Sequence, residues 1–525
     1  MVNLMDRNEL IKETCKKNFT CEILIIGGGA TGLGVAVDAA SRGYSVILLE
    51  QSDFAKGTSS RSTKLVHGGV RYLQQGDIQM VVGALHERGR MRQNAPHLVK
   101  DMRFIIGNYR WWEQPFYTIG LSLYDLLAGR LGLGRSLPLT KKKVVNEIPG
   151  LKKSKLRGGV VYHDGQFDDA RLAISLAETA VEHGAVCLNY VKVDKLLKNP
   201  EGKLNGVEAT DLIHGEKYTF NAKVIINATG VFVDDIMKID NPETKNKVRP
   251  SQGIHLVVDQ KFLGGKSALM IPKTEDGRVL FGVPWHNKVV LGTTDTPLNN
   301  HCLEPKALEE EIDFVLDQAG QYLELKPTRK DVLSVFAGLR PLAAPTQSDT
   351  RKTKEISRSH KIYKSKSGLL TITGGKWTTY REMAEEAVDR SIVLGNLVPR
   401  LCVTKTLKVH GYSTNTDDST WDYVYGSDAK KINLLKQENK EYAQLLHKDY
   451  TFTVAHVVWA VREEMAQTVE DVLARRVRLL FLDARVAAEV APMVASIMAK
   501  ELCKDRNWEE EQITEFRSLA KGYIL

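Results

Sequence analysis

Residues 59–73, SSRSTKLVHGGVRYL, place several chemically useful side chains around a glycine pair. Lys64, His67, Arg71 and Tyr72 could bind an anion or exchange a proton, and the segment contains no acidic residue. It has neither a helical nor a strand period, so periodicity alone describes it as a connecting loop. A plain connector could be shorter and less basic, which makes the segment a candidate site wall.

Two further arginines have the chemistry of an anion site. Arg340 lies in the apolar stretch FAGLRPLAAP, where a charge is costly unless it is paired or bound to a ligand. Arg358 lies in the very basic run RKTKEISRSHK. Forked guanidinium donors match phosphate oxygens. A salt bridge to an acid between domains explains Arg340 equally well, and it explains Arg358 better than a bound ligand does.

Two histidines are candidates for a general base. His255 lies in the apolar strand GIHLVV, and a neutral imidazole with a pKa of about 6.5 can accept a proton near neutral pH. A lone histidine on such a strand is also often a core residue with satisfied hydrogen bonds. His67 is the alternative, although its neighbouring glycines suggest close packing of the backbone. The residues leave this choice open.

A complete βαβ unit at residues 22–50 positions the first of these segments. It reads EILIIGGGATGLGVAVDAASRGYSVILLE, with glycines at Gly27, Gly29 and Gly32. The first permits a tight turn, the second a close approach to a pyrophosphate and the third packing of the helix on the sheet. Glu50 ends the second strand at the spacing of an acid that binds ribose hydroxyls. The unit therefore predicts a dinucleotide site.

Two later stretches favour a flavin over a nicotinamide. The strand KVIINATGVFV (223–233) ends in small residues that allow close passage beside a nucleotide. The stretch GLLTITGGKWTTYREM (368–383) predicts a strand, glycines, Lys376 and then a helix. A helix N-terminus stabilises negative charge, and a reduced flavin carries such charge whereas nicotinamide does not. A plain strand-to-helix turn remains the alternative for this stretch.

The composition excludes several classes of protein. The 525 residues carry a net charge of +9, which suits an anionic substrate, an anionic membrane surface or nucleic acid. The six cysteines form no C-x-x-C pair, which predicts reduced thiols in an intracellular protein. The N-terminus is too polar for a signal peptide, and no run of about 18 apolar residues predicts a membrane span. No motif predicts a nucleic-acid site.

Several segments together resemble the FAD-dependent glycerol-3-phosphate dehydrogenases. The matching stretches are IIGGGATGLGVAVDAASRG, TSSRSTKLVHGGVRYL, FDDARL at 167–172, NATG at 227–230, QGIHLVV at 252–258, LGTTDT at 291–296, AGLRPL at 337–342 and GGKWTTYREMAE at 374–385. The resemblance covers nearly the whole chain. It implies oxidation of sn-glycerol 3-phosphate to dihydroxyacetone phosphate, with hydride passing from C2 to flavin N5 and electrons then passing to membrane quinone.

The resemblance also implies roles for individual residues. The catalytic group is expected to comprise His255, Arg340 and Lys376, and the substrate-binding group Arg71, Tyr72, Arg340 and Arg358. The FAD-binding group is expected to comprise Gly27, Gly29, Gly32, Glu50, Thr58, Ser59, Ser60, Lys64, Leu65, His67, Val193, Gly230, Gly375 and Lys376. We expect no metal, because the calcium-binding loop of mitochondrial relatives has no counterpart here.

The expected fold class is α/β (α+β mixed), with three domains. A discontinuous Rossmann-like FAD-binding domain is predicted at 20–80, 155–235 and 355–392. An interleaved antiparallel-sheet substrate domain is predicted at 81–154 and 236–354, and a helical C-terminal domain at 395–525. Within the last domain, helices are expected at 429–447 and 454–503.

A membrane contact is expected at residues 111–143. On one face of a predicted helix lie Ile119, Leu123, Leu126 and Leu127; aromatic residues precede it, and Arg130, Arg135 and Lys141–Lys143 follow. This pattern suits an interfacial helix on anionic lipid, although a core helix followed by a solvated lysine run explains it too. The expected location is therefore cytoplasmic, with peripheral attachment to the inner face of the cell membrane, and a homodimer is possible.

Two other functions remain open at this stage. An oxygen-using glycerol-3-phosphate oxidase, or an amine or amino-acid oxidase, could use the same scaffold. The lack of the long insertion of the oxidase subgroup favours a dehydrogenase. A flavin-retaining protein that binds membranes or nucleic acid through its basic surface is the third possibility.

Overall fold

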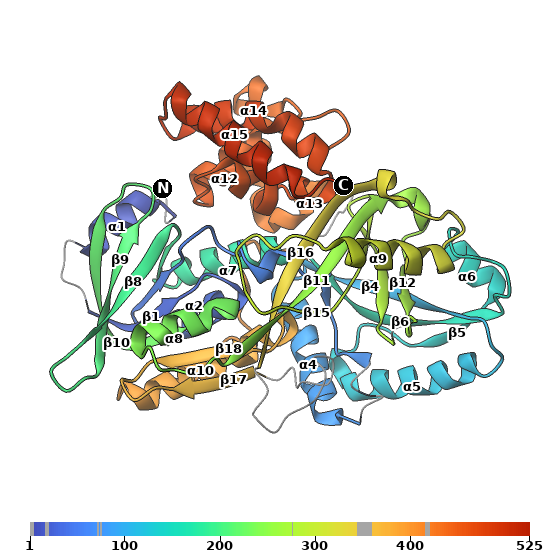
Figure 1. Cartoon of the computed structure of the whole chain (residues 1–525), viewed down its shortest axis with the longest axis horizontal. Helices are drawn as coiled ribbons and strands as arrows, with labels where there is room; N and C mark the ends of the chain where they lie inside the picture. Colours follow the sequence, from blue (N-terminus) through green and yellow to red (C-terminus); the bar gives the residue numbers. More distant parts are fainter. Residues whose placement is uncertain are drawn as a thin grey trace.

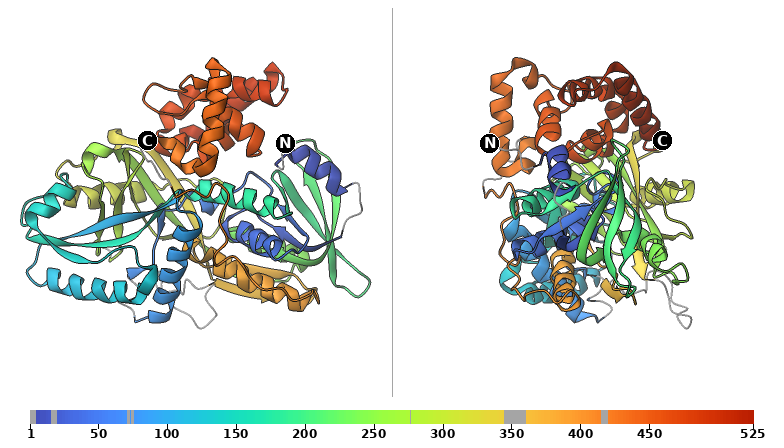
Figure 2. Two further views of the ribbon diagram at one scale, coloured as in Figure 1. Left: turned by 180° about the vertical axis from the view of Figure 1, so that it is seen from behind. Right: turned by 90° about the vertical axis from the view of Figure 1, so that its left-hand side faces the viewer.

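The computed structural model describes residues 5–15, 20–70, 73, 76–275, 277–343, 360–414 and 420–525. Two large β-sheets lie side by side along the long axis of the molecule (Figure 1). Helices of the C-terminal part lie on one side, across the junction of the two sheets (Figure 2). This arrangement confirms the expected mixed α/β fold with a helical C-terminal domain.

The first sheet, sheet A, has a parallel centre. Its strand order is β17-β18-β10-β1-β2-β7, and β8 and β9 extend β10 on a side branch. Strands β18, β10, β1, β2 and β7 run parallel, whereas β17 is antiparallel. The bounds are β1 Thr20–Ile26, β2 Val46–Leu49, β7 Val186–Leu188, β8 Val191–Lys198, β9 Leu204–Asp211, β10 Lys217–Asn227, β17 His360–Lys364 and β18 Leu370–Gly374.

Both faces of sheet A are buried, which explains the continuous apolar runs of its parallel strands. In β1, Ile23 and Ile25 face a core shared with α2 (Ala30–Ser41), α7 (Asp169–Glu182) and α10 (Tyr380–Leu394). Leu24 and Ile26 face a second core, shared with α1 (Arg7–Cys15), α8 (Val233–Asp240) and the β8–β9 hairpin. The carboxyl ends of the parallel strands meet at one edge, where ligands bind in open α/β sheets.

The second sheet, sheet B, is antiparallel except where β12 pairs with β4. Its order is β15-β11-β14-β13-β12-β4-β6-β3, with β16 paired to β11 and β5 to β6. The bounds are β3 Leu65–Val66, β4 Val99–Asn108, β5 Leu137–Thr140, β6 Gly158–Phe167, β11 Val248–Asp259, β12 Ala268–Ile271, β13 Leu280–Trp285, β14 Lys288–Gly292, β15 Thr296–Pro297 and β16 Val332–Ala343. Helices α6 (Lys141–Glu147) and α9 (Glu309–Tyr322) help bury one face.

Two strands of sheet B lie in segments predicted for the FAD-binding domain. Strand β6 pairs with β4 over its whole length, and β3 pairs with β6. The predicted boundaries at 80/81 and 154/155 therefore differ from the division between the sheets, because β6 pairs with β4 and β3 pairs with β6. Residues 50–64, which include the start of the SSRSTKLVHGGVRYL stretch, connect β2 of sheet A to β3 of sheet B.

The C-terminal part is helical in the described residues. Its helices are α11 Ala429–Glu438, α12 Val454–Glu463, α13 Leu479–Leu482, α14 Ala484–Glu501 and α15 Arg506–Lys521, with a π-helical turn at Asp471–Arg476. The predicted helical stretch 454–503 is interrupted between α12 and α13. Met465 and Arg478 adopt left-handed φ values of 55° and 62°, which end regular helix.

The remaining helices are α4 (Ile78–Asn94) and α5 (Glu113–Ala128), together with short 3₁₀ turns. These turns are Thr58–Ser60, Gly129–Leu131, Gly230–Phe232, Gln260–Phe262, Arg329–Asp331, Trp377–Thr379, Trp421–Asp428 and Lys440–Ala443. Among the described residues, none of the helices combines the length and the apolar character needed to cross a bilayer.

Candidate functional site

A cavity of about 800 Å³ is lined by both sheets. Sheet A contributes the carboxyl ends of β1, β2, β10 and β18 with the turns that follow them. Sheet B contributes residues of β11, β13 and β16, and the connecting segment from residue 55 to 70 forms much of the wall between. The sequence motifs therefore converge on one cavity.

The glycine turn after β1 packs too closely against neighbouring backbone to admit side chains at Gly27 and Gly32. Gly27 has φ +109°, and a Cβ there would lie 2.8 Å from the carbonyl oxygen of Ala228. A Cβ on Gly32 would lie 1.8 Å from the carbonyl oxygen of Gly27. Helix α2 begins directly afterwards, with Gly29 as its N-cap. The backbone N–H groups of its first turn suit a pyrophosphate.

The Glu50 carboxylate holds this turn in place. Its Oε2 accepts a hydrogen bond from the Gly28 N–H at 2.6 Å, and its Oε1 accepts one from the Ser52 N–H at 2.8 Å. Burial raises the pKa of Glu50, and the two backbone hydrogen bonds act against that shift. Each carboxylate oxygen keeps a second lone pair, so Glu50 can also accept hydrogen bonds from ribose hydroxyls.

Most of the predicted cofactor residues line the cavity. These are Gly27, Gly29, Glu50, Thr58, Ser59, Leu65, His67, Val193, Gly230, Gly375 and Lys376. Gly32, Ser60 and Lys64 do not belong to the lining. Gly32 serves the helix–strand packing described above, and Ser60 is buried, with its carbonyl oxygen accepting from Lys64 Nζ at 2.7 Å.

Lys64, predicted as a cofactor-binding residue, does not line the cavity. Lys64 is fully buried, and its Nζ donates to both carboxylate oxygens of Asp169, at 2.9 and 2.7 Å. A left-handed φ of 65° directs the side chain to this pair while its neighbours Thr63 and Leu65 line the cavity. Burial lowers the pKa of Lys64 to about 7, against the opposing charge of Asp169.

Arg340 lies at the cavity wall and is paired with an acid. It lines the cavity from β16, and its Nη1 lies 3.3 Å from Oδ1 of Asp295. Its Nη2 donates to the carbonyl oxygen of Thr294 at 2.9 Å and to Oγ1 of Thr293 at 3.1 Å. Asp295 lies in the connection between β14 and β15, so this ion pair forms within the sheet-B domain. These contacts hold the guanidinium at the cavity wall.

Gly253 makes room for this guanidinium. A Cβ at that position would lie 2.2 Å from Nη2 of Arg340 and 2.6 Å from Oγ1 of Thr293. Gly253 faces Gly338 in the β11–β16 pairing, so both strands carry glycine beside the arginine. The role of Gly253 was not predicted from the sequence. The only signal for it was that the stretches QGIHLVV and AGLRPL each contain a glycine.

His255 reaches the cavity from β11, the strand paired with β16. Its Nε2 lies 2.9 Å from Oγ1 of Thr63, and its ring stacks on Phe336 with centroids 4.9 Å apart. Its Nδ1 is buried without a hydrogen-bond partner among the described residues. Burial, and then the charges of Lys64 and Arg340, lower the pKa of His255 well below its usual value. The imidazole is therefore neutral and able to accept a proton.

The other predicted site residues fall into two groups. His67 lines the cavity and its N–H donates to Oγ1 of Thr378 at 3.3 Å. Lys376 lines it at the start of the turn Trp377–Thr379, which leads into α10. Arg71, Tyr72 and Arg358 lie outside the described residues, so their substrate roles stay predictions.

The structure adds residues that the sequence analysis did not select. Arg278 is a further cation in the lining, and Thr63 supplies the hydroxyl that faces His255. Trp377 lines the cavity, and its Nε1 donates to the carbonyl oxygen of Ser59 at 2.9 Å. Thr63 belongs to the recognised stretch TSSRSTKLVHGGVRYL, whereas no local sequence pattern indicated a site role for Arg278. The glycine-walled cleft, the helix N-terminus and the acid after β2 together fit FAD.

Comparisons with known proteins agree with this geometry. The family model described as FAD dependent oxidoreductase matches residues 22–381, and the one described as C-terminal domain of alpha-glycerophosphate oxidase matches 370–513. The mitochondrial glycerol-3-phosphate dehydrogenase of Schizosaccharomyces pombe is 38% identical over 98% of this chain and 89% of its own length. That of Homo sapiens is 38% identical over 96% of this chain and 73% of its own length.

Solved structures show the same fold. A glycerol-3-phosphate dehydrogenase from Bacillus halodurans, complexed with FAD, has a TM-score of 0.81 and 30% identity, covering 100% of this chain and 99% of its own. An L-alpha-glycerophosphate oxidase from Mycoplasma pneumoniae shares only the fold, with a TM-score of 0.56 and 17% identity over 73% of this chain and 96% of its own. The chain belongs to the family of FAD-dependent glycerol-3-phosphate dehydrogenases.

Proposed function

We propose that the protein oxidises sn-glycerol 3-phosphate to dihydroxyacetone phosphate and delivers the two electrons to membrane quinone. The observation that supports this most directly is the placement of Arg340 and His255 on paired strands at one cavity wall. Arg340 lies opposite Ser251 in the β11–β16 register, and His255 follows four residues along β11. A cation for the phosphate and a neutral base for the hydroxyl thus face one space.

Each residue has a distinct proposed task. Arg340 binds the substrate phosphate, assisted by Arg71, Tyr72 and Arg358 as the family pattern implies. His255 accepts the proton of the C2 hydroxyl. Bound FAD supplies a two-electron acceptor, N5, for the C2 hydride. Lys376, at the start of the turn before α10, stabilises developing negative charge beside it. His67 is the alternative base.

The phosphate role of Arg340 is tested by Arg340→Ala, with Gly253→Ala as a second variant that displaces the guanidinium without removing it. We expect KM to rise about tenfold or more in both, because a hydrogen bond to a charged group contributes about 1.5–3 kcal/mol. FAD content should stay at the wild-type level. Arg329→Ala is the control, since that arginine pairs with Asp313 on the surface. Wild-type KM in Arg340→Ala would remove the phosphate role.

The proton role of His255 is tested by pH dependence. Its pKa is lowered in the folded protein, so the neutral form is favoured there, and any stability this contributes is lost as pH falls below about 6.5. We therefore expect kcat/KM to stay level from pH 7 down to about 6 and to fall only at lower pH. His255→Asn should lower kcat/KM by about 10²–10⁴. A full rate in His255→Asn, with a loss in His67→Asn, would move the role to His67.

The reaction and its acceptor can be separated in one anaerobic experiment. Glycerol 3-phosphate should bleach the flavin absorbance of the purified protein, and a quinone analogue should then restore it faster than oxygen does. Amino acids should cause no bleaching. Faster reoxidation by oxygen would favour the oxidase alternative, and bleaching by an amino acid would replace the proposed substrate.

Membrane attachment through α5 is the last part of the proposal. Trp111, Ile119 and Leu126 are 78%, 72% and 75% exposed, and Lys141–Lys143 are exposed nearby. Helix α5 lies at the edge of the molecule opposite the C-terminal helices (Figure 1). Leu127 departs from the predicted face, because it packs beside Tyr124 and Ala128. Apolar side chains beside a basic segment suit the surface of an anionic bilayer.

Vesicle sedimentation tests this attachment. Replacing Lys141–Lys143 with Glu should release the protein from vesicles that contain anionic lipid, because each basic residue contributes about 1 kcal/mol near such a surface. Ile119→Glu with Leu126→Glu should release it as well. Val393→Glu, at a side chain that is 84% exposed on α10, is the matched control. Equal binding of all variants would exclude α5 as the contact.

A further inference from the structure

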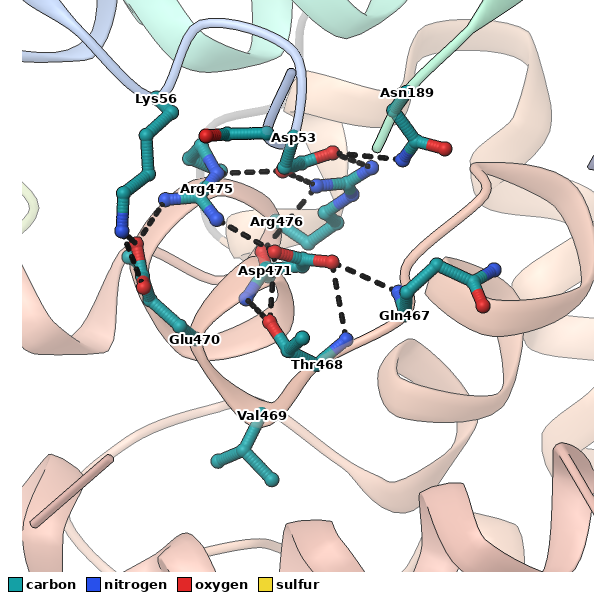
Figure 3. A network of polar contacts seen from close by, with 12 residues as sticks. Asp53, Lys56, Asn189, Gln467, Thr468, Val469, Glu470, Asp471, Arg475 and Arg476 are labelled. Carbon is teal, nitrogen blue, oxygen red and sulfur yellow. Dashed lines mark hydrogen bonds and ion pairs between the residues drawn. The ribbon is translucent and has the colours of Figure 1, made fainter. Parts of the chain in front are cut away.

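The segment between α12 and α13, residues 464–478, packs against the loops that form the cofactor cavity. We call it the clasp segment. Its side chains meet residues 53–60 and 189–190, which continue into the cavity lining at Lys56, Thr58, Ser59 and Val191 (Figure 3). We infer that the clasp segment is a set of positioning residues for FAD, so that docking of the C-terminal domain and tight binding of FAD are thermodynamically coupled.

The first contact is made to Asp53, three residues after Glu50. Asp53 is fully buried, and its carboxylate accepts from Nε of Arg475 at 2.5 Å and from both Nη atoms of Arg476 (Figure 3). Burial alone would raise the pKa of Asp53, but the charges of Arg476 and Arg475 outweigh it and hold the pKa below its usual value. The loop that carries Glu50 is therefore anchored from the C-terminal domain.

The second contact is made to the turn after β7. Nδ2 of Asn189 donates to the Met465 carbonyl oxygen at 3.0 Å, and the Tyr190 hydroxyl donates to Oδ1 of Asp471 at 2.7 Å. Val191, the next residue, lines the cavity and its N–H donates to the carbonyl oxygen of Glu50 at 2.8 Å. The clasp segment thus holds two neighbouring wall segments at once.

The third contact reaches residues 56–60. Nζ of Lys56, a lining residue, donates to the carboxylate of Glu470 at 2.6 and 2.5 Å. Nη2 of Arg478 donates to the Ser60 carbonyl oxygen at 3.0 Å and to Oδ1 of Asp169 at 2.8 Å. Oγ of Ser59, the residue directly before this carbonyl, accepts the Ala30 N–H at 2.9 Å at the start of α2.

The charged side chains of the clasp segment belong to one connected network. Asp53, Glu470 and Asp471 face Lys56, Arg475 and Arg476, and the network extends to Glu304 through Lys56 and to Glu464 through Arg476. Buried ion pairs of this kind add little net stability compared with an apolar packing, but removal of one partner is strongly destabilising because it leaves a buried charge uncompensated. Loops held by such a set are already ordered when FAD binds, which lowers the entropy cost of binding.

The inference is tested by FAD affinity, measured on apoprotein by quenching of flavin fluorescence. Arg476→Met should raise the dissociation constant of FAD at least tenfold. Arg42→Met is the matched control, because Arg42 is buried and pairs with Asp38 of α2, and both residues lie outside the clasp segment and the cavity lining. Both variants should lose thermal stability, but the control should keep the FAD dissociation constant within about twofold of wild type.

A milder pair keeps the test decisive if Arg476→Met does not fold. Glu470→Gln removes one charge from a partly exposed pair, and Glu501→Gln does the same for the surface pair with Arg462. Only Glu470→Gln should weaken FAD binding. Equal FAD affinity in wild type and Glu470→Gln, or equal losses in the two arginine variants, would overturn the coupling. No substrate or electron acceptor enters the measurement, so its outcome does not depend on the proposed reaction.

Discussion

The buried carboxylate of Asp169 joins all three parts of the molecule. It accepts hydrogen bonds from the side chain and backbone of Ser62, from Nζ of Lys64 and from Nη2 of Arg478. Ser62 and Lys64 belong to the connection between the sheets, Asp169 begins α7 under sheet A, and Arg478 belongs to the C-terminal domain. An uncompensated charge here would be costly, so the three parts must meet in this arrangement. The FDDARL stretch therefore contributes Asp169 to the junction of the three parts.

The contacts of Asp169 also affect the position of Thr63 and the charge around His255 at the candidate active site. With Lys64 turned into the core, Thr63 is left facing the cavity, where its hydroxyl meets His255. Burial, together with the nearby positive charges of Lys64 and Arg340, lowers the pKa of His255 and disfavours a protonated imidazole. The buried cluster thereby positions the cavity wall and adds to the preference for a neutral His255, while Gly253 leaves the space that Arg340 needs.

The sequence predicted those parts of the site whose residues lie together in one continuous stretch of the chain. The βαβ unit at residues 22–50 carries its strands, glycines and acid in one continuous stretch, and the structure places Gly27, Gly29 and Glu50 at the cavity. Lys64 could not be predicted in the same way. A basic residue beside glycines suits a ligand wall or an ion pair equally, and only the position of Asp169, more than a hundred residues later, distinguishes the two.

The sequence by itself determined the fold class, the cofactor family and the strand that carries His255, because these depend on periodicity and on glycine spacing along the chain. The tertiary structure decided which charges meet. Arg340 lies beside Asp295, α5 presents Ile119 and Leu126 to solvent, and Arg475 and Arg476 reach Asp53. Burial and pairing of charges arise between segments far apart in the chain, and no local pattern records them.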